Sequence, residues 1–123
     1  MKGVKFRAYI KRRHENYNFD AGMYGWEDVK TWAYLWDMVE EGLIELMQFI
    51  GLQDKCGVDI YEGDIVEFDV VNMIWDEDKH EVKEHRPETW RRVIEWKAPK
   101  FIKHWYPEKM KVVGNIYENP DRR

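Results

Sequence analysis

The chain has 123 residues, of which 44% are hydrophobic and 36% charged, with a formal net charge of −4. This composition predicts one compact, soluble domain with a real core and excludes a disordered chain. No apolar run approaches the roughly 20 residues of a membrane-spanning helix, and no apolar stretch follows the basic start as in a secretory signal, so we expect no membrane partner.

The charges are sorted along the chain. Residues 14–88 hold 20 acidic and 5 basic side chains, a net charge of −15, whereas residues 1–13 and 89–123 together hold 15 basic and 4 acidic side chains, a net charge of +11. If the first and last strands pair side by side, these segments form one basic face. The single cysteine, Cys56, cannot form an intramolecular disulfide, which suits the cytoplasm of a bacterial host cell.

The first part of the chain predicts a strand, a helix and a second strand. Residues 4–10 alternate between apolar and polar side chains, the period of a half-buried strand. Within residues 26–41, apolar side chains recur at spacings of three and four (Val29, Trp32, Trp36, Val39), which favours a helix that ends at Gly42. The aromatic residues there would also suit a strand. The short apolar run at 43–50 predicts a strand buried on both faces.

Turns and short strands follow. Residues 54–57 and 61–64 have the composition of turns, and Val66, Phe68 and Val70 alternate with acidic residues as in a strand. Residues 76–89 are almost all charged and predict a solvated loop. Another strand is expected around Trp90, Ile94 and Trp96, and two more at 101–106 and 110–113. This succession of short strands predicts a small antiparallel barrel or roll.

Three segments carry a resemblance to a known family. They are residues 5–9 (KFRAY), 46–66 (LMQFIGLQDKCGVDIYEGDIV) and 112–120 (VVGNIYENP). In order and spacing they resemble the YopX family of small phage and prophage proteins. This chain has Cys56 where the family typically has asparagine, Tyr9 where it has tryptophan and Ile50 where it has threonine. None of these changes threatens the resemblance.

The resemblance implies a β-rich fold with an SH3-like barrel, encoded by a phage or prophage. Combined with the pattern, it predicts a mainly β (α+β) domain over 1–123, with an N-terminal strand and helix part (1–50) and a small antiparallel SH3-like barrel part (51–120). It implies no catalytic activity, cofactor or substrate. The motif residues are interpreted as structural: Gly51, Gly57, Tyr61, Glu62, Gly63, Asp64, Gly114, Asn115, Tyr117, Asn119 and Pro120.

Two groups of residues could carry metal or acid–base chemistry. His80 and His85 lie near several carboxylates (Asp76, Asp78, Glu81, Glu84), and another four carboxylates lie close together in the sequence (Glu62, Asp64, Glu67, Asp69). Neither group matches a known ligand motif or supplies a nucleophile and base. Solvated charge and turn formation explain both better, so we predict no catalytic, cofactor or metal residues and no small-molecule substrate. A metal-dependent hydrolase is a minor alternative.

Aromatic and basic residues are interleaved near the end of the chain. The candidate binding surface consists of Trp90, Arg91, Arg92, Trp96, Lys97, Lys100, Lys103 and Trp105. Such residues stack bases and hold phosphates, and they are equally typical of protein interfaces. The favoured hypothesis is a non-enzymatic phage accessory protein that binds another protein or itself. The alternative is a nucleic-acid-associated protein in phage replication or regulation.

Overall fold

The computed structural model describes residues 5–14, 16–95 and 106–123. Two short strands and two short helices come first: β1 (Phe6–Ile10), β2 (Gly22–Tyr24), α1 (Trp26–Val29) and α2 (Leu35–Glu40). The remaining elements are mostly strands: β3 (Ile44–Gln53), β4 (Asp59–Tyr61), β5 (Asp64–Asp76), β6 (Glu81–Val93), η1 (Pro107–Lys109), β7 (Lys111–Asn115) and η2 (Pro120–Arg122).

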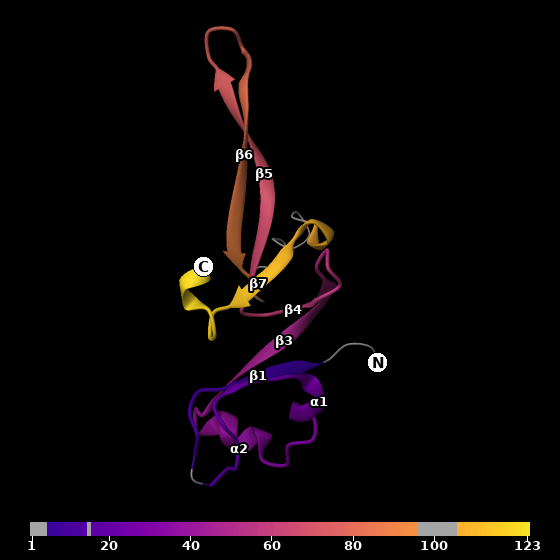
Figure 1. The fold of residues 1–123 in the computed structure, drawn as a ribbon, viewed down its shortest axis with the longest axis vertical. Coiled ribbons are helices and arrows are strands. Elements are labelled where there is room, and N and C mark those ends of the chain that lie inside the picture. The colour runs from indigo at the N-terminus through magenta and orange to yellow at the C-terminus, as the bar shows by residue number, and fades with distance from the viewer. Residues whose placement is uncertain (1–4, 15, 96–105) are drawn as a thin grey trace.

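The described strands form two antiparallel sheets. One sheet has the order β2-β1-β3-β4 and the other has the order β6-β5-β7. The molecule is elongated, with the N-terminal sheet and helices at one end and the β5–β6 hairpin projecting from the other (Figure 1). The prediction of a mainly β fold is confirmed.

The region 26–41 forms two short helices, so the prediction of one continuous helix was wrong in extent. The backbone N–H groups of Thr31 and Trp32 bond three residues back, and the Thr31 hydroxyl donates to the carbonyl oxygen of Asp28 at 2.6 Å. Threonine side chains that bond the nearby backbone in this way compete with the helical ladder. Trp36, one of the apolar residues whose spacing favoured the helix, is 68% exposed, and the buried residue of α2 is Met38.

Two apolar clusters hold the fold together. The first lies between the N-terminal sheet and the helices and comprises Ala8, Ile10, Val29, Met38, Leu43 and Ile44. The second lies beside β5 and comprises Ile60, Val66, Phe68, Ile94 and Met110. Strand β3 connects them, because Ile44 belongs to the first cluster and Ile50 packs against the second. The proposed division of the chain at residue 50 stays a prediction.

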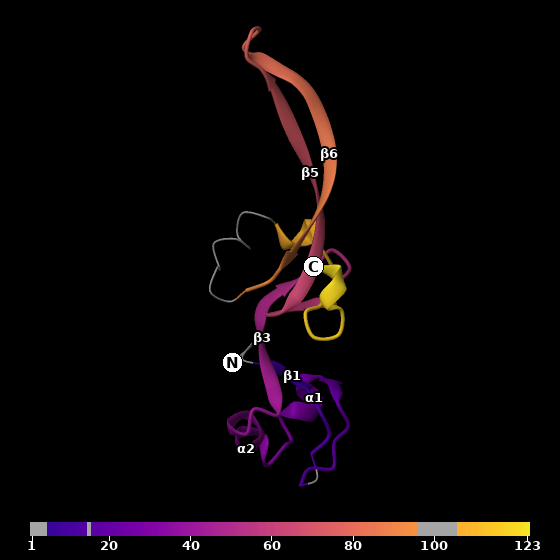
Figure 2. The ribbon, with the colours of Figure 1, turned by 90° about the vertical axis from the view of Figure 1, so that its left-hand side faces the viewer.

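Strand β3 confirms the strand predicted at 43–50, but its burial is uneven. Leu43, Ile44 and Met47 are buried, whereas the strand becomes progressively exposed toward Gln53. The reason is visible in Figure 1, where β3 leaves the N-terminal sheet and helices and runs toward β4 and β7, and Figure 2 shows the same strand from the side. A strand that passes from one core to another cannot be covered on both faces along its whole length.

The charged stretch 76–89 is not a solvated loop, so that prediction was wrong. Residues 81–93 form β6, which pairs with β5 from Ile65↔Val93 out to Asp76↔Glu81. Only residues 77–80 make the turn, where the Asp76 carboxylate accepts the backbone N–H groups of Asp78 and Lys79 at 2.9 and 3.1 Å. This ribbon is held by backbone hydrogen bonds between the two strands. Because both of its faces are exposed to solvent, charged side chains can lie on either face, and the sequence then lacks the apolar–polar alternation by which a strand is predicted.

At the end of the chain, β7 confirms the strand expected around 110–113. The strand predicted at 101–106 lies, apart from Tyr106, outside the described residues, as does Trp96. In the described part of the chain, no helix is long and apolar enough to cross a membrane.

Candidate functional site

The turn before β5 is organised by a buried carboxylate. Asp64 is 1% exposed, pairs with the guanidinium of Arg7 at 2.5 Å and accepts the Tyr61 backbone N–H at 2.8 Å. Gly63 supplies a positive φ of 85° in this turn. Burial raises the pKa of Asp64, and the Arg7 charge opposes that rise. Arg7 also lies over the Tyr61 ring at 4.7 Å, so the pair joins β1 to the β4–β5 turn.

A second carboxylate organises the β3–β4 turn. One oxygen of Asp54 accepts the N–H groups of Cys56 and Val58 at 2.8 and 2.9 Å, and the other accepts the N–H of Val112 at 2.8 Å. Burial would raise the pKa of Asp54, but these three donors together lower it. Asp54 thus ties the turn to β7. We did not single it out from the sequence, although an aspartate that opens a turn is a recognisable signal.

The segment after β7 is held by asparagine side chains. The Asn115 carboxamide oxygen accepts the N–H groups of Tyr117 and Glu118 at 3.1 and 2.9 Å. A Cβ added at Gly114 would lie 2.7 Å from the carboxamide oxygen of Asn119, so only glycine fits there. Tyr117 stacks on Tyr9 of β1 with ring centroids 5.2 Å apart.

Of the remaining motif residues, Gly51 lies within β3, where the register with β4 shifts, and the others lie at turns or in η2. Gly51 and Gly57 have φ values of 87° and 79°, Glu62 belongs to the turn that contains Gly63, and Pro120 begins η2. Apart from Gly51, the motif residues therefore lie at or next to chain reversals, where Asp64 and Asn115 accept hydrogen bonds from the backbone.

The carboxylates and histidines considered for metal or acid–base chemistry do not converge. Asp64 is engaged by Arg7, Glu67 pairs with Arg91 at 3.0 Å, and Asp69 accepts a hydrogen bond from Thr89 at 2.9 Å. Among the described residues, no three His, Cys, Asp or Glu side chains gather as metal ligands would.

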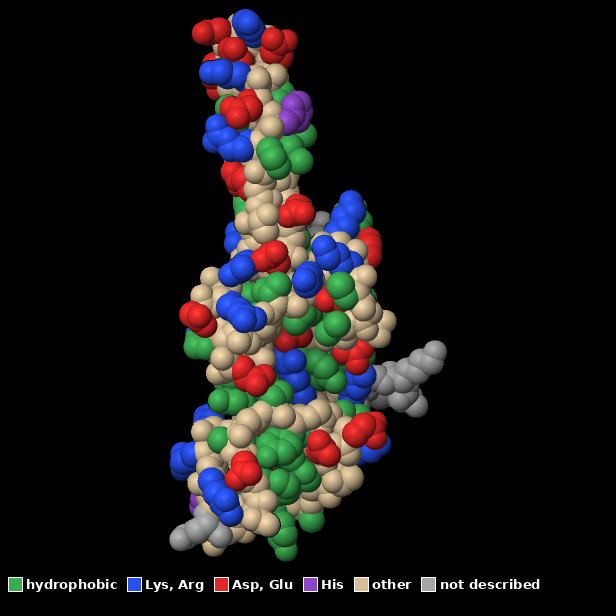
Figure 3. Space-filling model, viewed as in Figure 1, with side chains coloured by type: hydrophobic (Ala, Val, Ile, Leu, Met, Phe, Trp, Pro, Cys, Tyr) green, Lys and Arg blue, Asp and Glu red, His purple; other side chains and the backbone are tan. Residues whose placement is uncertain are grey.

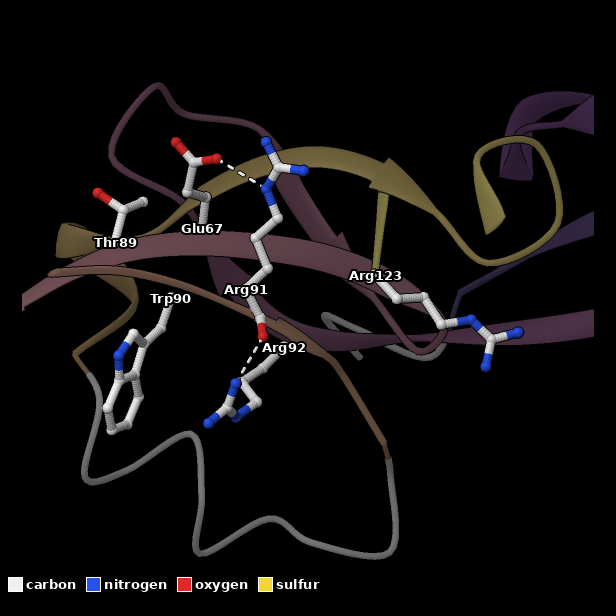
Figure 4. A pocket seen from close by; sticks show the side chains of 6 residues that line it. All are labelled: Glu67, Thr89, Trp90, Arg91, Arg92 and Arg123. Atoms are coloured by element: carbon white, nitrogen blue, oxygen red, sulfur yellow. Dashed lines mark hydrogen bonds and ion pairs between the residues drawn. The ribbon is translucent and has the colours of Figure 1, made fainter. Parts of the chain in front are cut away.

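Part of the predicted aromatic and basic surface lines a hollow on β6. Its lining consists of Glu67, Thr89, Trp90, Arg91, Arg92 and Arg123, around an open volume of about 470 Å³ (Figure 4). Arg92 lies 4.9 Å from the Trp90 ring centroid, and these two side chains point away from the Arg91–Glu67 pair. The structure thus brings Arg123 of the C-terminus to the predicted residues of β6. Trp96, Lys97, Lys100, Lys103 and Trp105 lie outside the described residues.

The basic first strand does not join this hollow. Within the described residues, β1 pairs with β2 and β3 and belongs to the other sheet. The lysines that flank β1 pair with carboxylates, with Lys5 2.6 Å from Asp59 and Lys11 2.7 Å from Glu45. The condition for a continuous basic face, that β1 pairs beside the strands at 90–113, is not met.

The β5–β6 hairpin carries a feature that sequence reasoning missed. Strand β7 pairs with β5 only from Asp64 to Glu67, so residues 69–76 of β5 and their partners on β6 project as a two-stranded arm (Figure 1). From Val71 to Trp75, every second residue of β5 is apolar and exposed: Val71 (57%), Met73 (62%) and Trp75 (52%). Their partners on β6 are Pro87, His85 and Val82. We call these six residues the apolar face of the arm.

The opposite face of the arm is charged. On that face Asn72 and Ile74 lie opposite Arg86 and Glu84, which form an ion pair at 3.2 Å. In Figure 3 charged side chains gather at the tip of the arm, and hydrophobic side chains are exposed below it. The arm is therefore amphipathic across its two faces. The alternation of Val71, Met73 and Trp75 is the pattern in the sequence that indicates this face. It was overlooked because the charged residues 76–89 were interpreted as a loop.

These features define a small, mainly β protein with an exposed amphipathic arm and a basic hollow at the base of that arm. The chain belongs to the YopX family, because the model of the family described as YopX protein matches residues 5–122. The resemblance carried by the three sequence segments is thereby confirmed.

Comparison with solved structures finds the crystal structure of protein EF1440 from Enterococcus faecalis. It is 20% identical, the match covers 96% of each chain, and the TM-score is 0.41, too low to carry an argument. Comparison with curated proteins finds no match. Membership of the family does not define the activity of this chain, so the activity has to be inferred from the residues at its surface.

Proposed function

We propose that this chain is a non-enzymatic protein-binding or self-assembly module that contacts its partner through the apolar face of the β5–β6 arm. The observation that carries the proposal is that Val71, Met73 and Trp75 are each more than half exposed on one face of the same ribbon. An isolated two-stranded ribbon is only marginally stable in water, and adjacent exposed apolar side chains mark interaction sites. A partner that covers this face would stabilise the arm and remove the apolar surface from water.

The arm's position supports a binding role. It projects beyond both apolar clusters, so a partner can reach either face without displacing the body (Figures 1 and 2). Trp75 and Met73 belong to the residue types enriched at interfaces, and Pro87 beside them is apolar.

The test places a photo-reactive amino acid at Met73 and, as the matched control, at Glu84 on the charged face. Irradiation of cells that make the full chain should yield covalent adducts with a defined protein, identified by mass spectrometry, from position 73 and not from position 84. The double change Val71→Ser with Trp75→Ser should abolish the adduct. The proposal is wrong if position 73 gives no protein adduct and the purified chain stays monomeric up to millimolar concentration.

A second candidate function is nucleic-acid binding at the hollow on β6. The pairing of Arg92 with the Trp90 ring at 4.9 Å, next to Arg91 and Arg123, supports it, because aromatic and guanidinium groups stack bases and hold phosphates. It is the weaker candidate because Glu67 already engages Arg91 and because β1 contributes no basic residue. Gel shifts with single- and double-stranded DNA and RNA at low salt test it, and binding should weaken steeply with added salt.

The SH3-like form of the barrel, the phage or prophage origin and the cytoplasmic location stay predictions. The SH3-like form of the barrel is supported by the arrangement of β4, β5, β7 and part of β3 around the second apolar cluster. The origin in a phage or prophage rests on the family resemblance. The bacterial cytoplasm rests on the single cysteine, Cys56, which is exposed and unbridged.

A further inference from the structure

The arm has two edges of very different character. The edge of β6 is protected from pairing by Pro87, which has no N–H to donate, and by charges at Lys83, Glu84 and Arg86. Between Val70 and Trp75, the edge of β5 has neither device. Its residues 70–75 read VVNMIW, without charge, proline or glycine, and β7 no longer pairs with it. Proteins rarely leave such an edge open, because it is a template for another strand.

We infer that the β5 edge pairs with the β5 edge of a second copy of this chain, antiparallel and about a two-fold axis at Asn72. This inference rests on the proposed function and names the partner and the atoms of contact. The result is a continuous four-stranded sheet of order β6-β5-β5-β6, in which strand addition supplies backbone hydrogen bonds along the edge. The two apolar faces then lie on the same side of the sheet and form one larger surface.

Symmetry restricts the register of this pair. In an antiparallel pair, residues directly opposite each other point to the same face, so a two-fold axis must pass through a residue and not between two residues. With the axis at Asn72, Val71 lies opposite Met73 of the other copy, and Val70 lies opposite Ile74. Asn72 lies opposite itself, so that each carboxamide can donate to the other. Between Val70 and Ile74, apolar residues thus meet apolar residues on both faces, and Asn72 meets Asn72; outside this stretch, Asp69 meets Trp75.

The neighbouring symmetric register fits less well. With the axis at Met73, Asp69 of one copy would lie opposite Glu77 of the other, and Val70 would lie opposite Asp76. Like charges directly opposite each other destabilise a strand pair. The axis at Asn72 places Asp69 opposite Trp75 instead and avoids the repulsion.

Charge complementarity at the two ends of the pair favours a second copy as the occupant. In the antiparallel arrangement, the tip of one arm arrives beside the start of β7 in the other copy. Residues 76–81 of the tip contain four acidic residues and one lysine, a net charge of −3. At this point η1 ends with Lys109 and β7 begins with Lys111, both exposed; with the exposed Glu108, residues 107–111 carry a net charge of +1. Each copy therefore brings an acidic tip to a basic site on the other, twice per dimer.

Sedimentation equilibrium of the full chain is the first test. The monomer mass is 15.1 kDa, so a dimer has twice that mass, about 30 kDa. Asn72→Asp should raise the dimer dissociation constant about fivefold or more, because two carboxylates then face each other at the axis. Within one chain the new carboxylate lies opposite Arg86, but it also lies beside Glu88, whose carboxylate accepts a hydrogen bond from Asn72 at 3.4 Å. Circular dichroism therefore checks that the variant monomer keeps its fold. Asn72→Ser is the matched control and should leave the dimer intact.

Disulfide trapping tests the register directly. In a Cys56→Ser background, Asn72→Cys places two thiols opposite each other, where the Cα separation of an antiparallel pair suits a disulfide. Oxidation should give a covalent dimer from position 72 and none from Glu84→Cys on the protected edge. A dimer trapped by Met73→Cys but not by Asn72→Cys would mean face-to-face packing, which overturns the edge pairing and keeps the proposed function.

A wild-type chain that stays monomeric, or one in which Asn72→Asp and Asn72→Ser dimerise equally and position 72 gives no covalent dimer, would also overturn the inference. In that case an adduct at Met73 with another protein would still uphold the proposed function. Loss of both the dimer and the adduct would overturn the two proposals together.

Discussion

The Arg7–Asp64 pair offers the sharpest test of how this fold is held together. Its side chains are 13% and 1% exposed and 2.5 Å apart, and they join the first strand to the turn before β5 across 57 positions of sequence. Replacing Arg7 with methionine keeps much of the side-chain volume but removes the cation. Of the two donors that now bond the buried Asp64 carboxylate, the Arg7 guanidinium and the Tyr61 backbone N–H, only the second would remain.

The expected cost is large. Breaking a buried ion pair by removing one partner typically destabilises a protein by about 3–5 kcal/mol, because the remaining charge is left without compensation. For a chain of this size that corresponds to a fall in melting temperature of about 10–20 °C. Replacing both residues (Arg7→Met with Asp64→Asn) removes the stranded charge, so the double variant should be more stable than Arg7→Met alone.

The destabilisation caused by Arg7→Met should depend on pH. Burial already raises the pKa of Asp64, and loss of the Arg7 charge, which opposes that rise, should raise it further. The folded state of Arg7→Met then binds this proton more tightly than the unfolded state does. The resulting stabilisation is complete below the unfolded pKa of about 3.9 and is lost as the pH rises through the higher folded pKa. The deficit of Arg7→Met relative to wild type should therefore shrink as the pH falls from 7 toward 4.

Urea unfolding of wild type, both single variants and the double variant at pH 7 and pH 4.5 measures these free energies. A loss below about 1 kcal/mol for Arg7→Met at pH 7, or a loss that does not shrink at pH 4.5, would refute the reasoning. The first result would mean that water solvates the carboxylate, and the second that Asp64 is not the group left unpaired.

Three further changes follow from the contacts. Asp54→Ala leaves three backbone N–H groups without an acceptor and should lower the free energy of unfolding by about 2–4 kcal/mol in urea titrations. Since the pKa of Asp54 is lowered in the folded state, its contribution is present above about pH 3.9 and is lost as the pH falls through the folded pKa. An unchanged urea midpoint would contradict this. Gly114→Ala brings a Cβ to 2.7 Å from Asn119 and should lower stability by about 1–3 kcal/mol, with recovery in the double variant Gly114→Ala/Asn119→Gly; no recovery would mean that the strain lies elsewhere. Met73→Ser with Trp75→Ser, by contrast, should change monomer stability by less than about 1 kcal/mol because both side chains are more than half exposed, while fluorescence of a bound hydrophobic dye should fall; a large loss of stability would show that the apolar face supports the arm itself.

The arm illustrates where local patterns mislead. Residues 81–93 carry charges on most positions, and their only reason to be a strand is the backbone ladder with β5, which lies earlier in the chain. Periodicity reports which side of an element is covered, so it is silent for a ribbon that is open on both faces. The helix predicted at 26–41 failed for a different reason, since the Thr31 hydroxyl competes for the Asp28 carbonyl at a point that spacing does not register.

What the sequence by itself determined is local and chemical. Alternation identified β1 and the start of β5, and the composition of the turns placed Gly57, Gly63 and Asp64 at chain reversals, because these effects act between near neighbours. The three motif segments also identified the YopX family, over residues 5–122.

What only the tertiary structure decided is which distant residues meet. It placed Arg7 on Asp64, brought Arg123 beside Trp90 and Arg91, and kept β1 out of the sheet that contains β6. It also placed the first residue of β7, Lys111, opposite Glu67, so that the outer part of β5 forms the arm with β6 alone among the described strands. These outcomes depend on long-range pairing and packing, whose free energies are set by partners far along the chain and not by the residues on either side.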